Sequence, residues 1–195
     1  MFQAKWKCMT ILSLLVVLLS GNKTYAARDF FWSDVVPIPS CSKSRDGSLK
    51  ELMIKKEDGT TITEELPSCE EAMKTRVLVR VNGKYLHAVA GTGGEPYIDN
   101  GRTMVPLRAI ADVFGFEVGW EESEGKITLK KEGKNIVMHI GKSEMLVDGE
   151  KVIFEDAVPT RKKNLTFLPV KQLADVLGIK VEWDGEKRLA TFTSE

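Results

Sequence analysis

The chain has 195 residues, of which 43% are hydrophobic and 29% charged, which is the composition of an ordinary globular protein. Its 28 basic and 28 acidic residues cancel, but the first 26 residues hold three lysines and no acidic residue, so the remainder is slightly acidic. A slightly acidic protein has no long-range attraction for nucleic acid or anionic lipid, and neither is expected as a partner.

Residues 1–26 have the pattern of a secretory signal peptide. Two lysines precede an apolar run from Met9 to Leu19, and Thr24-Tyr25-Ala26 offers small residues at the positions that are read for cleavage. Processing is predicted between Ala26 and Ala27. The apolar run is short for a bilayer span, so an uncleaved anchor is the less favoured alternative. We therefore expect a protein that is secreted or associated with the cell wall and has no membrane segment after cleavage.

Residues 27–75 form an N-terminal extension whose sequence pattern differs from that of the rest of the chain. An aromatic cluster, Phe30-Phe31-Trp32, opens it, and we expect this cluster to dock either on the following domain or on a partner. Strand-like runs at 52–57 and 60–66 flank Asp58-Gly59. This pair predicts a tight hairpin turn in which both turn residues have positive φ.

Two cysteines, Cys41 and Cys69, remain after the predicted processing. Export to an oxidising compartment favours one disulfide between them. By closing a loop of the chain, this bridge would stabilise the fold by about 2–4 kcal/mol. The alternative is two free thiols, which exported bacterial proteins tolerate in reducing surroundings. The compartment alone favours the bridge.

From residue 76 to residue 195 the sequence becomes regular and repeats itself. Residues 103–129 align without gaps onto residues 166–192, and nine of these 27 positions are identical. Such a match in a short window indicates an internal duplication. Because one copy cannot bury enough surface alone, we expect the two copies to share one core.

Each copy predicts a strand, a helix and two further strands. Pro106 and Pro169 fall where a helix begins, and apolar residues then follow at i, i+3, i+4 and i+7. Gly115 and Gly178 follow where a helix end needs a left-handed residue. Segments 135–140, 145–147 and 151–154 between the copies predict additional antiparallel strands.

A tryptophan closes the first strand after each helix. Trp120 follows Phe116 and Val118 at alternate positions, and Trp183 follows Ile179 and Val181 in the same way. Because period-two alternation places these side chains on one apolar face, we expect both tryptophans to be core residues rather than ligand platforms.

These residues resemble a known family. The runs Val81-Asn82-Gly83-Lys84 and 96–108, which includes Asn-Gly-Arg-Thr-Met-Val-Pro-Leu-Arg, and the Gly-x-x-Val-x-Trp pattern are similar to the copper amine oxidase N-terminal-like domain, also called the stalk domain. The second copy departs from the family pattern at 164–171. The resemblance implies an α+β fold, with a twisted antiparallel sheet packed on two short helices. It also implies a non-catalytic module of the bacterial cell envelope.

Catalytic and metal sites are not expected. A copper centre needs about three converging imidazoles, and the chain has only His87 and His139. Tyr97 lies between Pro96 and Ile98, unlike the cofactor-forming tyrosine of the oxidases. The sequence also lacks the serine-hydrolase, zinc-peptidase and phosphate-loop motifs. We therefore predict no enzyme activity, no cofactor and no metal.

Three side chains remain as candidate ligand contacts: Arg102, Arg108 and Trp32. The two arginines could meet an anionic glycan, although Arg108 could instead pair with Asp112 at i+4. The predicted partner is a cell-wall polysaccharide or a surface protein, and the sequence does not fix the oligomeric state. A wall hydrolase, or a modulator of one, is the alternative function.

Overall fold

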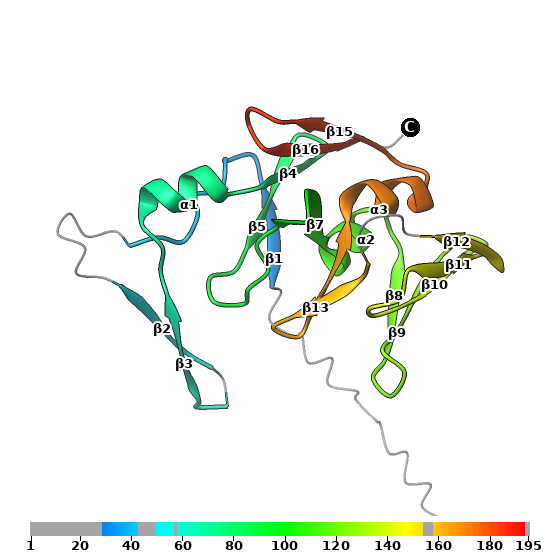
Figure 1. Ribbon diagram of the computed structural model, residues 1–195, viewed down its shortest axis with the longest axis horizontal. Helices are drawn as coiled ribbons and strands as arrows, with labels where there is room; N and C mark the ends of the chain where they lie inside the picture. Colours follow the sequence, from blue (N-terminus) through cyan, green and yellow to red (C-terminus); the bar gives the residue numbers. More distant parts are fainter. Residues whose placement is uncertain (1–28, 43–49, 57, 154–157, 194–195) are drawn as a thin grey trace, which may run out of the picture.

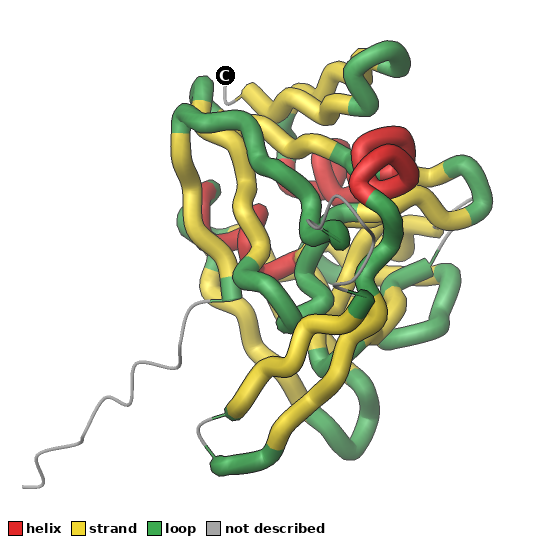
Figure 2. Tube along the Cα trace, turned by 90° about the vertical axis from the view of Figure 1, so that its left-hand side faces the viewer, coloured by secondary structure: helices red, strands yellow, loops and turns green. Residues whose placement is uncertain are grey.

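The computed structural model describes residues 29–42, 50–56, 58–153 and 158–193 (Figure 1). The predicted signal peptide and its cleavage point between Ala26 and Ala27 lie outside these residues. The described chain combines three short helices with many strands, most of them antiparallel, which confirms the α+β class. Figure 2 shows how far strands predominate over helices. Within the described ranges, no helix is long and apolar enough to cross a membrane.

The expectation of one antiparallel sheet is wrong, because the strands in the described ranges form three sheets of four or five strands and a separate hairpin. The first sheet has the order β1-β5-β4-β16-β15, and its β16–β4 pair is parallel. Its strands are β1 (Phe30–Ser33), β5 (Lys84–Ala88), β4 (Leu78–Val81), β16 (Leu189–Thr193) and β15 (Lys180–Asp184).

The second sheet is an antiparallel meander in the order β12-β11-β10-β9-β8. The third has the order β13-β14-β7-β6 and joins the two matched stretches of sequence. The meander strands are β8 (Glu117–Glu121), β9 (Lys126–Lys131), β10 (Lys134–His139), β11 (Glu144–Val147) and β12 (Glu150–Ile153). The strands of the third sheet are β6 (Tyr97–Asp99), β7 (Arg102–Pro106), β13 (Thr160–Lys162) and β14 (Leu165–Pro169).

The two predicted helices form where the sequence places them. α2 (Leu107–Val113) and α3 (Val170–Leu177) begin directly after Pro106 and Pro169, which occupy the N-cap positions. The apolar stripe of each helix is buried in the core. Gly115 and Gly178 have φ of 72° and 71°, so both helices end through a left-handed glycine as predicted.

Replacing Gly178 tests this helix end. The φ of 71° is unfavourable for a residue with a Cβ atom, so we expect Gly178→Ala to lower the free energy of unfolding by about 1–2 kcal/mol. The matched control is Gly185→Ala, where φ is not in the left-handed region and a Cβ would lie 3.7 Å from Trp183 Nε1, an ordinary contact. Urea denaturation measures both variants, and equal losses would contradict the explanation.

The two matched stretches meet at β7 and β14 in a symmetric register. Val105 pairs with Leu168, Met104 with Pro169 and Pro106 with Phe167. Val105 and Leu168 occupy equivalent positions of the two stretches. Met104 is equivalent to Phe167 and Pro106 to Pro169, so the other two pairs are related to each other by the same equivalence, as expected for a two-fold axis through the Val105–Leu168 pair. One hydrophobic core includes buried side chains from both stretches. Descent by duplication stays a prediction.

The aromatic cluster docks on the domain rather than remaining free. β1 pairs with β5 in antiparallel register, and Phe30 and Trp32 pack against the core. Phe31 points away from the core and stacks on His87, with ring centroids 4.6 Å apart. The first of the two expected positions of the cluster is therefore the one observed.

The rest of the extension forms a hairpin and a helix beside the domain (Figure 1). The hairpin pairs β2 (Glu51–Lys55) with β3 (Thr61–Glu65), and α1 (Cys69–Thr75) follows. The expected two-residue turn is wrong, because Lys55 pairs with Thr61 and the Lys56 amide donates to the Thr60 carbonyl oxygen at 2.8 Å, so the connection is longer than Asp58-Gly59 alone. Gly59 has a φ of 84°. A longer loop with one left-handed glycine is a common alternative hairpin connection.

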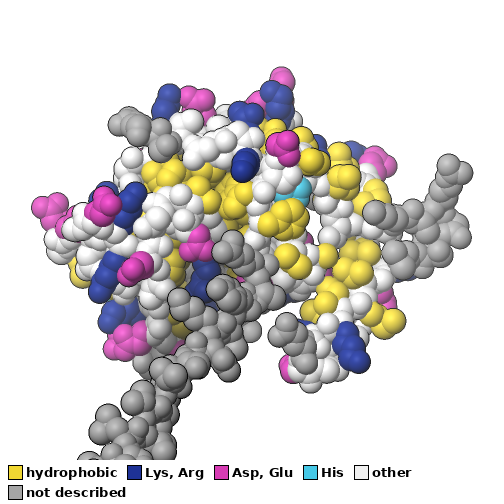
Figure 3. All heavy atoms as spheres, turned by 180° about the vertical axis from the view of Figure 1, so that it is seen from behind, with side chains coloured by type: hydrophobic (Ala, Val, Ile, Leu, Met, Phe, Trp, Pro, Cys, Tyr) yellow, Lys and Arg dark blue, Asp and Glu magenta, His cyan; other side chains and the backbone are white. Residues whose placement is uncertain are grey.

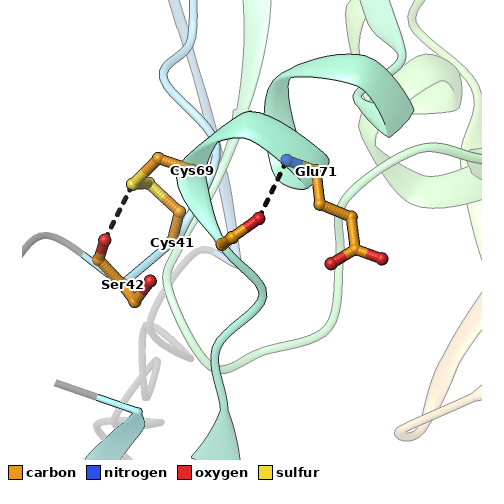
Figure 4. The surroundings of a disulfide bond; sticks show 5 residues. Cys41, Ser42, Cys69 and Glu71 are labelled. Atoms are coloured by element: carbon orange, nitrogen blue, oxygen red, sulfur yellow. Dashed lines mark hydrogen bonds between the residues drawn. A yellow bond between two sulfur atoms is a disulfide. The ribbon is translucent and has the colours of Figure 1, made fainter. Parts of the chain in front are cut away.

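Cys41 and Cys69 form a disulfide, which settles the choice between a bridge and free thiols (Figure 4). Their Cα atoms are 4.8 Å apart, and the bridge ties the start of α1 to the segment before the hairpin. The Ser42 carbonyl oxygen lies 2.9 Å from Cys69 Sγ, a sulfur–oxygen contact since the bonded sulfur carries no hydrogen. The Ser68 hydroxyl accepts a hydrogen bond from the Glu71 amide and caps the helix.

Candidate functional site

A cleft of about 320 Å³ opens where α2 and β8 of the first stretch meet the hairpin of β13 and β14. It combines an exposed indole, two arginines, two carboxylates and an amide, with an apolar floor. The residues that line it are Asp29, Phe30, Pro106, Leu107, Arg108, Val118, Gly119, Trp120, Glu122, Ile127, Arg161, Asn164, Leu165 and Thr166.

The prediction that both tryptophans are core residues is wrong. Trp120 is 37% exposed and Trp183 is 45% exposed. Each lies near the end of its strand, Trp120 in β8 and Trp183 in β15. Val118 packs against the core on the same side of β8, but the core ends before Trp120 is reached. The alternation of the strand is as expected, and only the extent of the core differs.

The indole of Trp120 is held beside an ion pair. The Arg161 guanidinium lies 5.1 Å from the centroid of the indole ring, within the range of a cation–π contact. Arg161 Nη1 donates to Glu122 Oε1 at 2.6 Å, and Trp120 Nε1 donates to Glu122 Oε2 at 2.5 Å. Arg161 Nη2 also donates to Asn164 Oδ1 at 3.3 Å. These contacts fix the guanidinium and the indole before any ligand arrives.

Hydrogen bonds from Arg161 and Trp120 hold the pKa of Glu122 below its ordinary value. The carboxylate is therefore ionised at neutral pH and accepts both bonds. A general acid for glycoside hydrolysis needs the opposite, a raised pKa that keeps its proton. Glu122 is thus suited to position Arg161 and Trp120 rather than to transfer a proton.

Arg108 brings a second positive charge to the cleft. It is exposed in the first turn of α2, and it forms no ion pair with Asp112 in the described structure. The alternative prediction, an ion pair between Arg108 and Asp112, is therefore wrong. With Arg161, this places two guanidinium groups around one exposed indole.

The indole of Trp120 remains partly open to solvent beside the guanidinium, since 37% of the residue is exposed. A flat ligand ring could stack on this exposed part while its polar groups reach the cleft. A separate hollow of about 400 Å³ lies over the opposite face of β8 and β9, beside Gly119 and Thr128.

Comparison with known protein families matches residues 80–192 to the copper amine oxidase N-terminal domain. The chain belongs to this family. The matched domain is the non-catalytic N-terminal domain of the oxidases, not the domain that carries their chemistry. No curated protein matches the chain. The match covers every segment of the cleft except Asp29 and Phe30, so the cleft belongs to the copper amine oxidase N-terminal domain itself.

The histidines of this copper amine oxidase N-terminal domain lie in different sheets. His87 in β5 is hydrogen-bonded to the Val35 carbonyl oxygen at 2.9 Å, and His139 lies in β10. Across the ranges that the structure describes, no group of three or more histidine, cysteine or acidic residues is placed to hold a metal ion.

The candidate contacts named from sequence are separated by the fold. Arg108 lines the cleft, whereas Trp32 packs against the core from β1 and Arg102 lies in β7 outside the cleft. The predictions from sequence did not include Arg161 and Glu122. No local signal joins them, because they are 39 residues apart and meet only through the packing of β13 beside β8.

A larger hollow of about 530 Å³ lies between the extension and the domain. Figure 3 shows hydrophobic side chains gathered on this face of the molecule. Prolines 37, 39, 67 and 96 line it with Ile38, Leu66 and Ile98. The extension therefore leaves a groove beside the copper amine oxidase N-terminal domain that these apolar side chains line together with charged ones such as Glu64 and Lys162.

Proposed function

We propose that the protein is a non-catalytic, exported module of the bacterial cell envelope, which binds an acidic cell-wall glycan at the Trp120 cleft. The predicted signal peptide supports the location. The observation that carries the binding role is the exposed indole of Trp120, held in place by Glu122 and flanked by Arg161 and Arg108. An aromatic ring with convergent polar groups is typical of a site that binds a ring-shaped polar ligand.

The chemistry of the cleft matches a sugar that carries a carboxylate. The apolar face of a pyranose ring can stack on the indole, while Arg108 and the free donors of Arg161 bind the carboxylate. The Asn164 amide and the remaining lone pairs of Glu122 can bind hydroxyl groups. Because Arg161 is already fixed, little side-chain entropy is lost when the sugar binds.

The test is co-sedimentation of residues 27–195 with purified peptidoglycan sacculi. We expect the parent protein to be retained and Trp120→Ala to weaken binding by roughly tenfold or more, as for the loss of a central aromatic contact. The matched control is Phe31→Ala, which removes another exposed aromatic ring outside the cleft and should bind as the parent does.

Two outcomes would contradict the proposal. The first is no retention of the parent protein on sacculi, and the second is equal binding by the parent and Trp120→Ala. The same samples also test the wall-hydrolase alternative through release of labelled fragments. Turnover that disappears in Glu122→Gln would replace glycan binding by hydrolysis as the function.

A further inference from the structure

We propose that the chain forms a symmetric dimer in which strand β12 of one copy pairs with β12 of a second copy. β12 is the outer strand of the meander and pairs with β11 on one side only. The meander lies at one end of the molecule, away from the extension (Figure 1). This inference goes beyond the proposed function and does not depend on what the Trp120 cleft binds.

The outer edge of β12 presents backbone groups that no described residue pairs. The Asp148 amide donates to a carbonyl oxygen of β10 at 2.8 Å. Successive residues of an antiparallel strand bond to alternate sides, so Val147 bonds in the other direction, toward its cross-strand neighbour Glu150 in β12. The same alternation along β12 turns the N–H and C=O groups of Lys151 and Ile153 away from β11.

The side chains of β12 are all exposed, and two of them are apolar. Val152 is 37% and Ile153 52% exposed. Val152 ends a row of cross-strand neighbours on the core face of the meander, after Met138 and Met145, which are both buried. The apolar row therefore stops at an open sheet edge, which is a template for pairing with another chain.

Lys151 is the side chain that would oppose such pairing, because lysines on edge strands keep sheets apart. Here its ammonium group forms an ion pair with the Glu144 carboxylate at 2.5 Å. The positive charge is therefore partly offset within the same copy, and the aliphatic stem of the lysine remains available for apolar contact.

A second copy fits this edge best in one register. Hydrogen bonds across the new ladder form between the outward residues, which are Lys151 and Ile153 of each copy. With Val152 on the two-fold axis, Lys151 of each copy pairs with Ile153 of the other, so every outward backbone group is bonded. With Lys151 or Ile153 on the axis, that residue alone pairs, and two lysines would face each other in the first case.

The same register matches the side chains. Val152 meets Val152 of the second copy on the core face, so the apolar row continues across the axis. On the outer face, Lys151 lies between Leu146 of its own copy and Ile153 of the other, and both of these side chains are exposed in one copy alone. This self-complementarity points to a second copy rather than to a different protein. Because β8 is the opposite edge of the meander, the Trp120 cleft stays open in the dimer.

The experiment is sedimentation velocity of residues 27–195 over a range of concentrations, for the parent, Val152→Glu and Val152→Lys. The interface is short, so we expect a concentration-dependent dimer of the parent. Either substitution sets two like charges against each other at the axis, which should raise the dissociation constant at least about tenfold. An equimolar mixture of Val152→Glu and Val152→Lys should recover a one-to-one dimer, because opposite charges then face each other.

The matched control is Val113→Glu, the same substitution at a valine of α2 that is 36% exposed. This variant should dimerise as the parent does. Hydrogen exchange locates the interface: the amides of Lys151 and Ile153 should exchange more slowly as the parent concentration rises. The amide of Val152, already bonded to β11, should not change.

Three outcomes would overturn the dimer. The first is a parent protein that stays monomeric up to about millimolar concentration, which would leave this edge to a strand of a different protein. The second is a dimer that persists in both charge variants, since another surface would then form it. The third is loss of the dimer in both variants without recovery in the mixture, although thermal unfolding shows that both are folded. None of these outcomes bears on binding to sacculi, so the dimer and the glycan site are tested separately.

Discussion

Replacing Phe192 by alanine should lower the free energy of unfolding by about 3–5 kcal/mol, the usual cost of emptying the space of a buried phenylalanine. Phe192 is 0% exposed and lies in β16 inside the first sheet. Its ring is 6.3 Å from that of Phe114, which follows α2 in the other matched stretch. The substitution therefore removes a contact that joins the two stretches, as well as apolar burial.

The effect should be global, because both stretches contribute to one core. Urea denaturation followed by tryptophan fluorescence and by far-ultraviolet circular dichroism should give one shifted transition for Phe192→Ala. The control is Phe31→Ala. This side chain is 51% exposed and stacks on His87, so its loss should cost less than about 1 kcal/mol. Two separate transitions would contradict a shared core.

Removing the disulfide should loosen the β2–β3 hairpin without unfolding the domain. The bridge joins residues 28 positions apart, and a loop of this length is worth about 3–4 kcal/mol in the chain-entropy model. The β2–β3 hairpin lies within that loop and has only two strands, which are marginally stable alone. Its amides should exchange about 10²–10³-fold faster in the double variant Cys41→Ser, Cys69→Ser.

Hydrogen exchange with residue resolution measures this effect, and the amides around Phe192 serve as the internal reference. The matched variant is Lys163→Ala, which removes the ion pair between Lys163 and Glu64 at 2.7 Å but keeps the disulfide. An exposed pair of this kind contributes less than about 1 kcal/mol, so hairpin exchange should change little. Unchanged amide exchange in the cysteine variant would mean that contacts with the domain, rather than the disulfide, stabilise the hairpin.

Local features of this chain follow from its sequence because they depend on neighbouring residues. Pro106 and Gly115 delimit α2, and Pro169 and Gly178 delimit α3, since each acts on the backbone within one turn of the helix. The Asp148-Gly149 turn has positive φ at both residues and joins β11 to β12. The family also follows from local runs, and the match over residues 80–192 confirms it.

Only the tertiary structure decides which strands pair. Period-two alternation assigns side chains to two faces but names no partner strand. The parallel pairing of β16 with β4 joins Thr191 to Arg80, which are 111 residues apart, and it divides the strands among three sheets. Two similar stretches of sequence suggest a single shared sheet, and no pattern of neighbouring residues indicates that the strands divide among several sheets.

The candidate site depends on the same long-range decisions. The sequence determined that Trp120 shares a face with Val118, but the extent of the core decided that Val118 packs against it while the indole is exposed. Arg161 and Glu122 meet because β13 packs beside β8, and nothing local to either residue indicates this. Local chemistry therefore determined the elements and their ends, whereas the limits of the core and the grouping of polar side chains came from packing between distant segments.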